Sequence, residues 1–168
     1  FVMTTYGIVR GFYHLDPSTI PASDHRYAAT LDGFDRYAVA MPLAELQKGE
    51  KFALLVTGGS AVSNNGVRFG KGHGYFDFEW AVLSELGLTD SSSVVADVVH
   101  DCQFVNEVMP AEKHDVVVDW VVTPTQAMHI DQSSRQSGRV FWELVPGTEF
   151  EQLSIVAELR AIQNLGPL

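Results

Sequence analysis

Three glycines occupy alternate positions in "RFGKGHGYFD", the segment from residue 68 to residue 77. A glycine-rich turn that opens a helix exposes several backbone N–H groups in one concavity, where the helix dipole adds partial positive charge. Arg68, Lys71 and His73 bring basic side chains to the same place. Asp77 would fall in the first helical turn, where its carboxylate could reach a magnesium ion held on phosphates. These residue types together predict a polyphosphate-binding loop.

A surface turn is the plainer interpretation of the same segment, because glycine is common wherever the backbone needs unusual dihedral angles. The pattern matches neither the dinucleotide motif G-x-G-x-x-G nor the P-loop motif G-x-x-x-x-G-K-[ST], so neither motif supports nucleotide binding here. The choice between a phosphate-binding loop and a surface turn therefore depends on the elements that position the segment.

The segments on either side of the loop read as alternating strands and helices. Apolar runs at 52–59, 92–101 and 116–123 have the composition of buried strands. Helical spacing over 77–88, with Gly87 as its stop, follows the loop directly, and an amphipathic helix is expected over 149–163. This alternation of strands and helices predicts an α/β layered fold with a mainly parallel sheet. In such folds ligands bind beyond the carboxyl ends of the strands.

The first residues form a separate region of the sequence. Residues 1–6 have strand composition, and "GFYHLDPSTIPASD" at 11–24 has the proline, serine and aspartate residues of a long loop. Phe1 is not an initiator residue, and the opening reads like the interior of a strand, so the chain is expected to be a fragment or a processed product.

Composition narrows the class of protein. The 168 residues suit one domain with a real core, and the formal net charge of −10 argues against a nucleic-acid partner. No apolar run reaches the ~18 residues of a membrane helix, so no membrane partner is expected. The one cysteine, Cys102, excludes an internal disulfide and fits a reducing cytosol, so a cytoplasmic location is expected.

The sequence gives weaker support for a catalytic or metal-binding role of the other polar residues. The clusters His100–Cys102 and His114–Asp115 lack the converging spacing of a zinc site, and a lone cysteine such as Cys102 is more often a small buried hydrophobe than a nucleophile. Asp119 interrupts the apolar run "VVVDWVV", so it is either a hydrogen-bond hub or a site residue, and we favour the site. The three tryptophans are expected in the core: Trp80, Trp120 and Trp142.

Two linked blocks carry a resemblance to a known family. The segment "GVRFGKGHGYFD" at 66–77 resembles the G-x-R-x-G-x-G-x-G-Y-Y-D segment of the 5-formyltetrahydrofolate cyclo-ligases, also called methenyltetrahydrofolate synthetases. The phrases "VHDCQ" and "VVTPT" are similar to the branch known as methenyltetrahydrofolate synthetase domain-containing proteins. The second block matches at Cys102, Gln103, His114, Asp115, Asp119 and Thr123. The resemblance is firm over residues 53–125.

This resemblance implies a three-layer Rossmann-like fold and an ATP-dependent reaction. ATP phosphorylates the formyl oxygen of 5-formyltetrahydrofolate, N10 closes the ring, and phosphate leaves to give 5,10-methenyltetrahydrofolate. It implies that ATP and a reduced folate are the partners and that magnesium is required. A homo-oligomer stays open, because the sequence does not settle the oligomeric state. Such phosphoryl transfer needs positioning and charge neutralisation more than covalent help.

The resemblance also implies roles for individual residues. The ATP phosphates would be held by Arg68, Gly70, Lys71, Gly72, His73, Gly74 and Tyr75. Tyr75 and Phe76 would border the folate, Lys71 and Asp77 would be the catalytic residues, and Asp77, with Asp119 as a second candidate, would hold magnesium.

The sequence departs from the family pattern in two places. Phe76 stands where the family has a second tyrosine, and the family's amino-terminal basic segment has no counterpart here. The chain is therefore expected to be a single, N-terminally incomplete cyclo-ligase-like domain over 1–168. Two other functions stay open: a non-catalytic nucleotide- or folate-binding module of the same family, and a sugar-phosphate enzyme on a similar fold.

Overall fold

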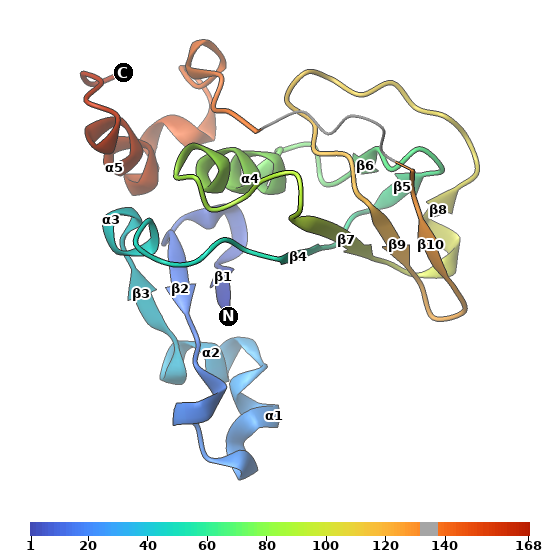
Figure 1. The fold of residues 1–168 in the computed structure, drawn as a ribbon, viewed down its shortest axis with the longest axis horizontal. Coiled ribbons are helices and arrows are strands. Elements are labelled where there is room, and N and C mark those ends of the chain that lie inside the picture. Colours follow the sequence, from blue (N-terminus) through green and yellow to red (C-terminus); the bar gives the residue numbers. More distant parts are fainter. Residues whose placement is uncertain (132–137) are drawn as a thin grey trace. The chain divides into compact units, whose positions relative to one another are not determined.

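The computed structural model describes residues 1–131 and 138–168, and the chain divides into two compact units (Figure 1). We call Gly49–Trp142 the central unit, and Phe1–Lys48 with Glu143–Leu168 the terminal unit. Each unit is described by itself. A single domain over 1–168 stays a prediction.

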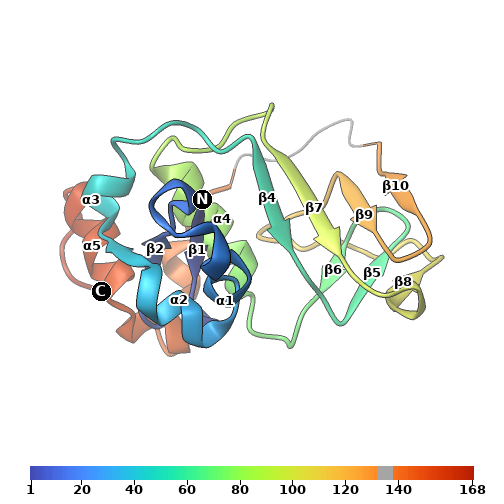
Figure 2. The same ribbon diagram turned by 90° about the horizontal axis from the view of Figure 1, so that it is seen from below.

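A four-stranded sheet organises the central unit, in the order β10-β9-β7-β4. Strands β4 (Leu54–Thr57), β7 (Val94–Val98) and β9 (Trp120–Val122) run parallel, and β10 (Ala127–His129) pairs antiparallel with β9. Figure 2 shows β4, β7 and β9 side by side. The predicted α/β fold with a mainly parallel sheet is therefore confirmed.

The apolar runs form these strands because their side chains supply the buried core: burial alternates along β4, whereas three consecutive residues of β7 are buried. Leu55 on β4 lies beside Val95 on β7, and Val95 and Val121 are fully buried. The strands are shorter than the apolar runs predicted. The run at 116–123, for example, contributes only Trp120–Val122 to the sheet.

A second, smaller sheet in the central unit carries the start of the glycine-rich segment. Its order is β6-β5-β8, with β5 at Ala61–Ser63, β6 at Arg68–Phe69 and β8 at Phe104–Val105. The strand β5 pairs antiparallel with β6 and parallel with β8. A 3-10 turn, Asp101–Gln103, precedes β8.

Helix α4 (Tyr75–Glu85) follows the glycine-rich segment, as predicted, but begins two residues earlier than the expected Asp77. Gly87, with a φ of 73°, is its stop, which confirms the predicted C-terminal signal. Its buried residues include Phe78, Val82 and Leu83, which belong to the apolar spacing seen in the sequence.

The terminal unit is built on an antiparallel sheet of β1 (Val2–Thr4), β2 (Phe12–His14) and β3 (Val39–Met41). Strand β2 lies inside the segment 11–24 that was predicted to be a loop, so that prediction was wrong for these three residues. Polar residues with proline dominate only the later part of that segment. The paired strands on both sides therefore decide its first residues.

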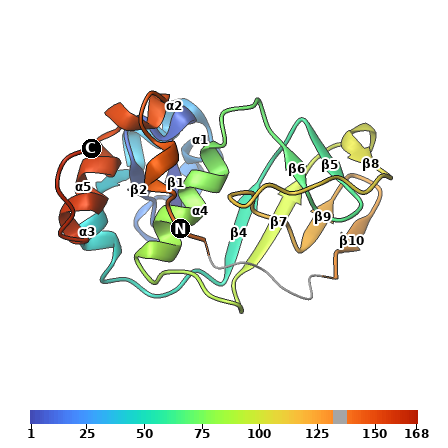
Figure 3. The same cartoon turned by 90° about the horizontal axis from the view of Figure 1, so that it is seen from above.

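Four helices complete this unit: α1 (His25–Ala28), α2 (Leu31–Tyr37), α3 (Leu43–Leu46) and α5 (Ser154–Ile162). Figure 3 shows α3 beside α5, where the Leu43 amide donates to Glu158 Oε2 at 2.9 Å. Helix α5 confirms the amphipathic helix predicted there, with Ile155, Val156 and Leu159 buried. The remaining 3-10 turns are Tyr6–Ile8, Pro17–Thr19, Ala22–Asp24, Trp142–Leu144 and Glu149–Gln152.

No helix in the described part of the chain is long and apolar enough to cross a membrane.

Candidate functional site: the glycine-rich loop

The glycine-rich loop, residues 70–74, connects β6 to the N-terminus of α4. Gly72 and Gly74 have φ angles of 86° and 70°, which side chains rarely tolerate, so glycine is required at both. Within the described part of the chain, the amides of Gly70, Gly72 and Gly74 donate no hydrogen bond. The loop therefore presents unused N–H donors beside a helix N-terminus, as an anion site requires.

Arg68, on β6, lies beneath this loop and is almost fully buried. Its side chain is 7% exposed, and Nη2 donates to Asp77 Oδ2 at 3.0 Å. Its guanidinium carbon lies 5.0 Å from the centre of the Phe76 ring. A methyl group at Gly70 would lie 3.2 Å from Arg68 Nη1, so the guanidinium reaches the loop backbone. A buried cation in this position can attract an anion without strong competition from water.

Asp77 lies in the first turn of α4, where the sequence placed it. Its Oδ1 accepts from the Val116 amide at 2.8 Å, and its Oδ2 pairs with Arg68. Burial raises the pKa of Asp77, while the Arg68 charge and the Val116 amide act against that rise. Each oxygen keeps a second lone pair. The carboxylate therefore fits a magnesium ion bound mainly by phosphate oxygens, which takes only one or two protein carboxylates.

The remaining predicted residues of the loop lie at its surface. Lys71 and His73 are exposed, and Tyr75 and Phe76 are half-buried. The His73 ring stacks on the Tyr75 ring, with centroids 5.1 Å apart and planes 7° apart. The predicted ATP-binding residues therefore come together in one short stretch of chain, and their roles stay predictions.

Asp119 lies outside the loop, in the segment that enters β9. Its Oδ2 accepts from the Val95 amide at 2.6 Å, and its own amide donates to the Val95 carbonyl. These two bonds join the segment to β7. Asp119 therefore acts as the hydrogen-bond hub that the sequence allowed as an alternative. A metal-binding role for Asp119 stays a prediction.

A further acidic residue, Asp97 on β7, was missed by the sequence analysis. It is 0% exposed, and burial raises its pKa to about 6, with Arg68 acting in the opposite direction. The signal was available: Asp97 interrupts the apolar run "VVADVV" just as Asp119 interrupts "VVVDWVV". The same argument from buried charge applies to both residues.

The polar residues around Cys102 make local hydrogen bonds. Gln103 donates to the Gly59 carbonyl at 2.6 Å, and Asp101 accepts from the hydroxyls of Thr123 and Thr125. Among the described residues there is no group of three or more His, Cys, Asp or Glu side chains that could hold a metal ion. Cys102 is exposed rather than buried, because it lies in the 3-10 turn before β8.

Comparison with known proteins settles the family. The model of the 5-formyltetrahydrofolate cyclo-ligase family matches residues 14–124. The chain belongs to this family. It is also similar to two proteins named methenyltetrahydrofolate synthase domain-containing protein. Identity is 33% over 139 residues for the human protein and 30% over 142 residues for that of Danio rerio, with 81% and 83% of this chain covered. The chain spans 35% and 36% of their lengths.

The matched segment of this cyclo-ligase family member contains the whole loop, together with Arg68, Asp77 and Asp97. The resemblance read from the sequence is therefore confirmed at the level of the family.

Of the three tryptophans expected in the core, Trp80 is 3% exposed, whereas Trp120 on β9 is 36% exposed. The core prediction is confirmed for Trp80 and wrong for Trp120.

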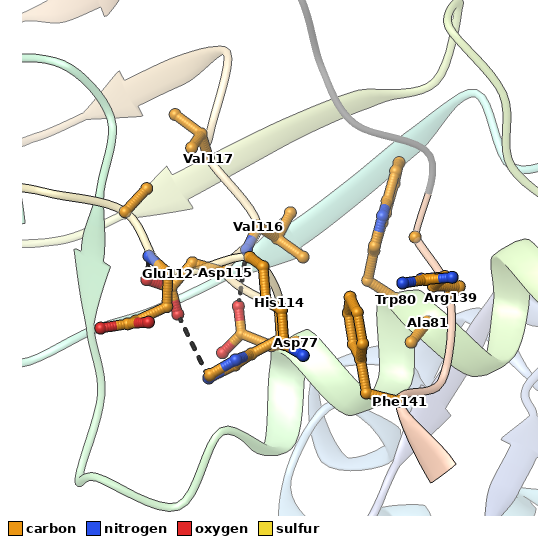
Figure 4. Close-up of a pocket in the computed structure, with 13 residues that line it drawn as sticks. Asp77, Trp80, Ala81, Glu112, His114, Asp115, Val116, Val117, Arg139 and Phe141 are labelled. Atoms are coloured by element: carbon orange, nitrogen blue, oxygen red, sulfur yellow. Dashed lines mark hydrogen bonds and ion pairs between the residues drawn. The ribbon is translucent and has the colours of Figure 1, made fainter. Parts of the chain in front are cut away.

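A pocket of about 420 Å³ adjoins Asp77 in the central unit (Figure 4). Trp80 and Phe141 supply its aromatic walls, and His114 and Asp115 lie on the opposite side in the close-up. Its volume is in the range of small-molecule sites. Phe141 lies outside residues 14–124, which the family model matches.

Proposed function

We propose that the chain carries out the cyclo-ligase reaction, the ATP- and magnesium-dependent conversion of 5-formyltetrahydrofolate to 5,10-methenyltetrahydrofolate. One observation supports it above the others. The amides of Gly70, Gly72 and Gly74 are unused at the N-terminus of α4, directly above the buried Arg68. A triphosphate provides the negative charge and the acceptor oxygens that such a group of donors binds.

In this proposal the residues act by positioning and by neutralising charge. The loop amides, with Arg68, Lys71 and His73, bind the phosphates and orient the γ-phosphate toward the formyl oxygen. Magnesium, when bound on the phosphates and Asp77, neutralises negative charge that develops during phosphoryl transfer. Tyr75 and Phe76 border the folate. ATP and a reduced folate as partners, and a cytoplasmic location, belong to the same proposal.

Turnover tests the proposal directly. The chain is mixed with 5-formyltetrahydrofolate, ATP and magnesium, and formation of the methenyl product is followed by its near-ultraviolet absorbance. We expect product formation that depends on both ATP and magnesium. Release of phosphate without the methenyl product, or no reaction with bound ATP, would contradict it.

Lys71→Ala is expected to weaken ATP binding by about tenfold, because an exposed cation at the phosphates is lost. The free energy of unfolding should change by less than ~0.5 kcal/mol, as for most surface substitutions. Titration calorimetry measures the first quantity and urea unfolding the second. Lys51→Ala is the matched control, since Lys51 is an exposed lysine of the same unit that pairs with Asp90. Equal ATP affinities for the two variants would show that Lys71 does not contribute to ATP binding.

A non-catalytic binding module of the same family is the second candidate. It is favoured by Phe76, which stands where the family has a tyrosine, and by the relatives' greater length, of which this chain spans about a third. A module would bind ATP at the loop and never consume it with any reduced folate. The turnover assay therefore separates the two functions, provided that ATP binding is measured on the same sample.

A further inference from the structure

Arg68 has more hydrogen-bond donors than its protein partners use. A guanidinium has several N–H donors, and among the described residues that of Arg68 makes one hydrogen bond, from Nη2 to Asp77 Oδ2 at 3.0 Å. Its Nε is buried and has no partner there. The side chain is 7% exposed, so bulk water reaches little of it. Buried donors without partners are costly, which is expected where a ligand accepts hydrogen bonds from them.

Three neighbours fix the guanidinium of Arg68 in one orientation. Asp77 binds its Nη2. Phe76 covers one face, because the guanidinium carbon lies over its ring at 5.0 Å from the ring centre, within the range of a cation–π contact. The turn after β4 packs against the stem, since a methyl group at Gly59 would lie 3.1 Å from Arg68 Cγ. Nη1 is the nitrogen beside the loop, 3.2 Å from the position of a methyl group at Gly70.

The contact with Phe76 affects ligand binding because it orders the arginine before a ligand arrives. An arginine side chain that can rotate loses this freedom when it binds an anion, and the loss weakens binding. The Phe76 ring, in contact with the guanidinium of the free protein, removes part of that cost in advance. The contact needs the face of the ring and no hydroxyl group, so phenylalanine serves it as well as the family's second tyrosine.

We propose that Phe76 is a positioning residue of the phosphate site, and that its ring holds the Arg68 guanidinium so that the unused donors bind a phosphate group at the glycine-rich loop. The inference rests on the proposed phosphate-binding role of the loop. Phe76 acts through Arg68 and needs no contact with the phosphate itself. One face of its ring is occupied by Arg68, which leaves the rest of the ring for the proposed contact with the folate.

Substitutions of Phe76 test the proposal, with inorganic tripolyphosphate without divalent ions as the probe and calorimetry near pH 7 as the measurement. Phe76→Leu keeps an apolar side chain but removes the ring. It should bind about three- to tenfold more weakly, as expected when one more side chain must be ordered on binding. Phe76→Tyr keeps the ring face and should bind within about twofold of wild type.

Phe104→Leu is the matched control. Phe104 is, like Phe76, a half-buried phenylalanine of the central unit, and no cation lies over its ring among the described residues. Its variant should bind tripolyphosphate within about twofold of wild type. A loss as large as that of Phe76→Leu would assign the effect to a general loosening of the unit and would overturn the inference.

The NMR signal of the Arg68 Nε–H group, assigned through the side-chain carbons of Arg68, reports the positioning in wild type itself. Because the guanidinium lies over the Phe76 ring, the ring current should shift this proton upfield of the ordinary arginine position. Tripolyphosphate should move the signal again. The upfield shift should be lost in Phe76→Leu and kept in Phe76→Tyr.

The outcomes separate this inference from the proposed function. An Nε proton at the ordinary arginine position in wild type, or equal affinities of Phe76→Leu and wild type, overturns the inference and leaves the phosphate-binding proposal standing. Equal losses of affinity in Phe76→Leu and Phe76→Tyr also overturn it, because the tyrosine keeps the ring face. No binding of tripolyphosphate by wild type overturns both.

Discussion

Replacing Arg68 with methionine is expected to destabilise the central unit by about 3–5 kcal/mol near neutral pH, the cost of breaking a buried ion pair by removing one partner. The side chains of Arg68 and Asp77 are 7% and 14% exposed, so little water can reach the Asp77 carboxylate in place of the guanidinium. Asp77 would then keep a buried charge with no cation beside it. The methionine side chain fills most of the space but offers no donor. Polyphosphate binding should be lost in the same variant.

Urea unfolding followed by tryptophan fluorescence measures this effect in the right unit, because Trp80, Trp120 and Trp142 all lie within Gly49–Trp142. The loss should shrink as pH falls, because the pKa of Asp77 is raised by burial and protonation removes the unpaired charge from the folded variant. Arg68→Lys, which keeps the charge, is the matched control and should lose less. A destabilisation below about 1 kcal/mol for the methionine variant would mean that the ion pair is not a major contributor.

Gly33→Ala is expected to destabilise the terminal unit by about 3 kcal/mol or more, through overpacking of two backbones. A methyl group at Gly33 in α2 would lie 1.8 Å from the Tyr27 carbonyl oxygen and 2.8 Å from the Ala28 Cα atom. Both atoms belong to the backbone of α1, so no side-chain rotation can relieve the clash. The helices would have to separate, and the Gly33 amide would lose its bond to Thr30 Oγ1, now 3.2 Å long.

Hydrogen exchange of the amides of α1 and α2 reports this change locally, and calorimetry reports it as a lower unfolding temperature. Gly166→Ala is the matched control in the same unit, because nothing lies within 4 Å of a methyl group there. It should leave both measurements unchanged. Equal exchange rates in α2 for the Gly33 variant and wild type would show that the helices can move apart without cost.

Local features of the chain could be predicted from the sequence because they depend on neighbouring residues. The alternate glycines predicted a turn, Gly87 indicated the end of α4, and the apolar spacing predicted α4 and α5. The parallel sheet followed from the order of these elements. The linked blocks around residues 66–77 and 95–125 identified the family, since their residue types and spacings are specific.

The strand limits and the environment of each charged side chain were decided only by the tertiary structure. Strand β2 formed inside a predicted loop because β1 and β3 pair with it. Asp97 and Asp119 stand at equivalent places in similar apolar runs, yet Asp119 accepts a hydrogen bond from a backbone amide, whereas neither oxygen of Asp97 has a hydrogen-bond partner among the described residues. The sequence by itself determined that a glycine-rich loop opens a helix beside an arginine and that the chain is a cyclo-ligase family member. The pairing of this arginine with Asp77, 9 residues away along the chain, was decided by packing that no local pattern records.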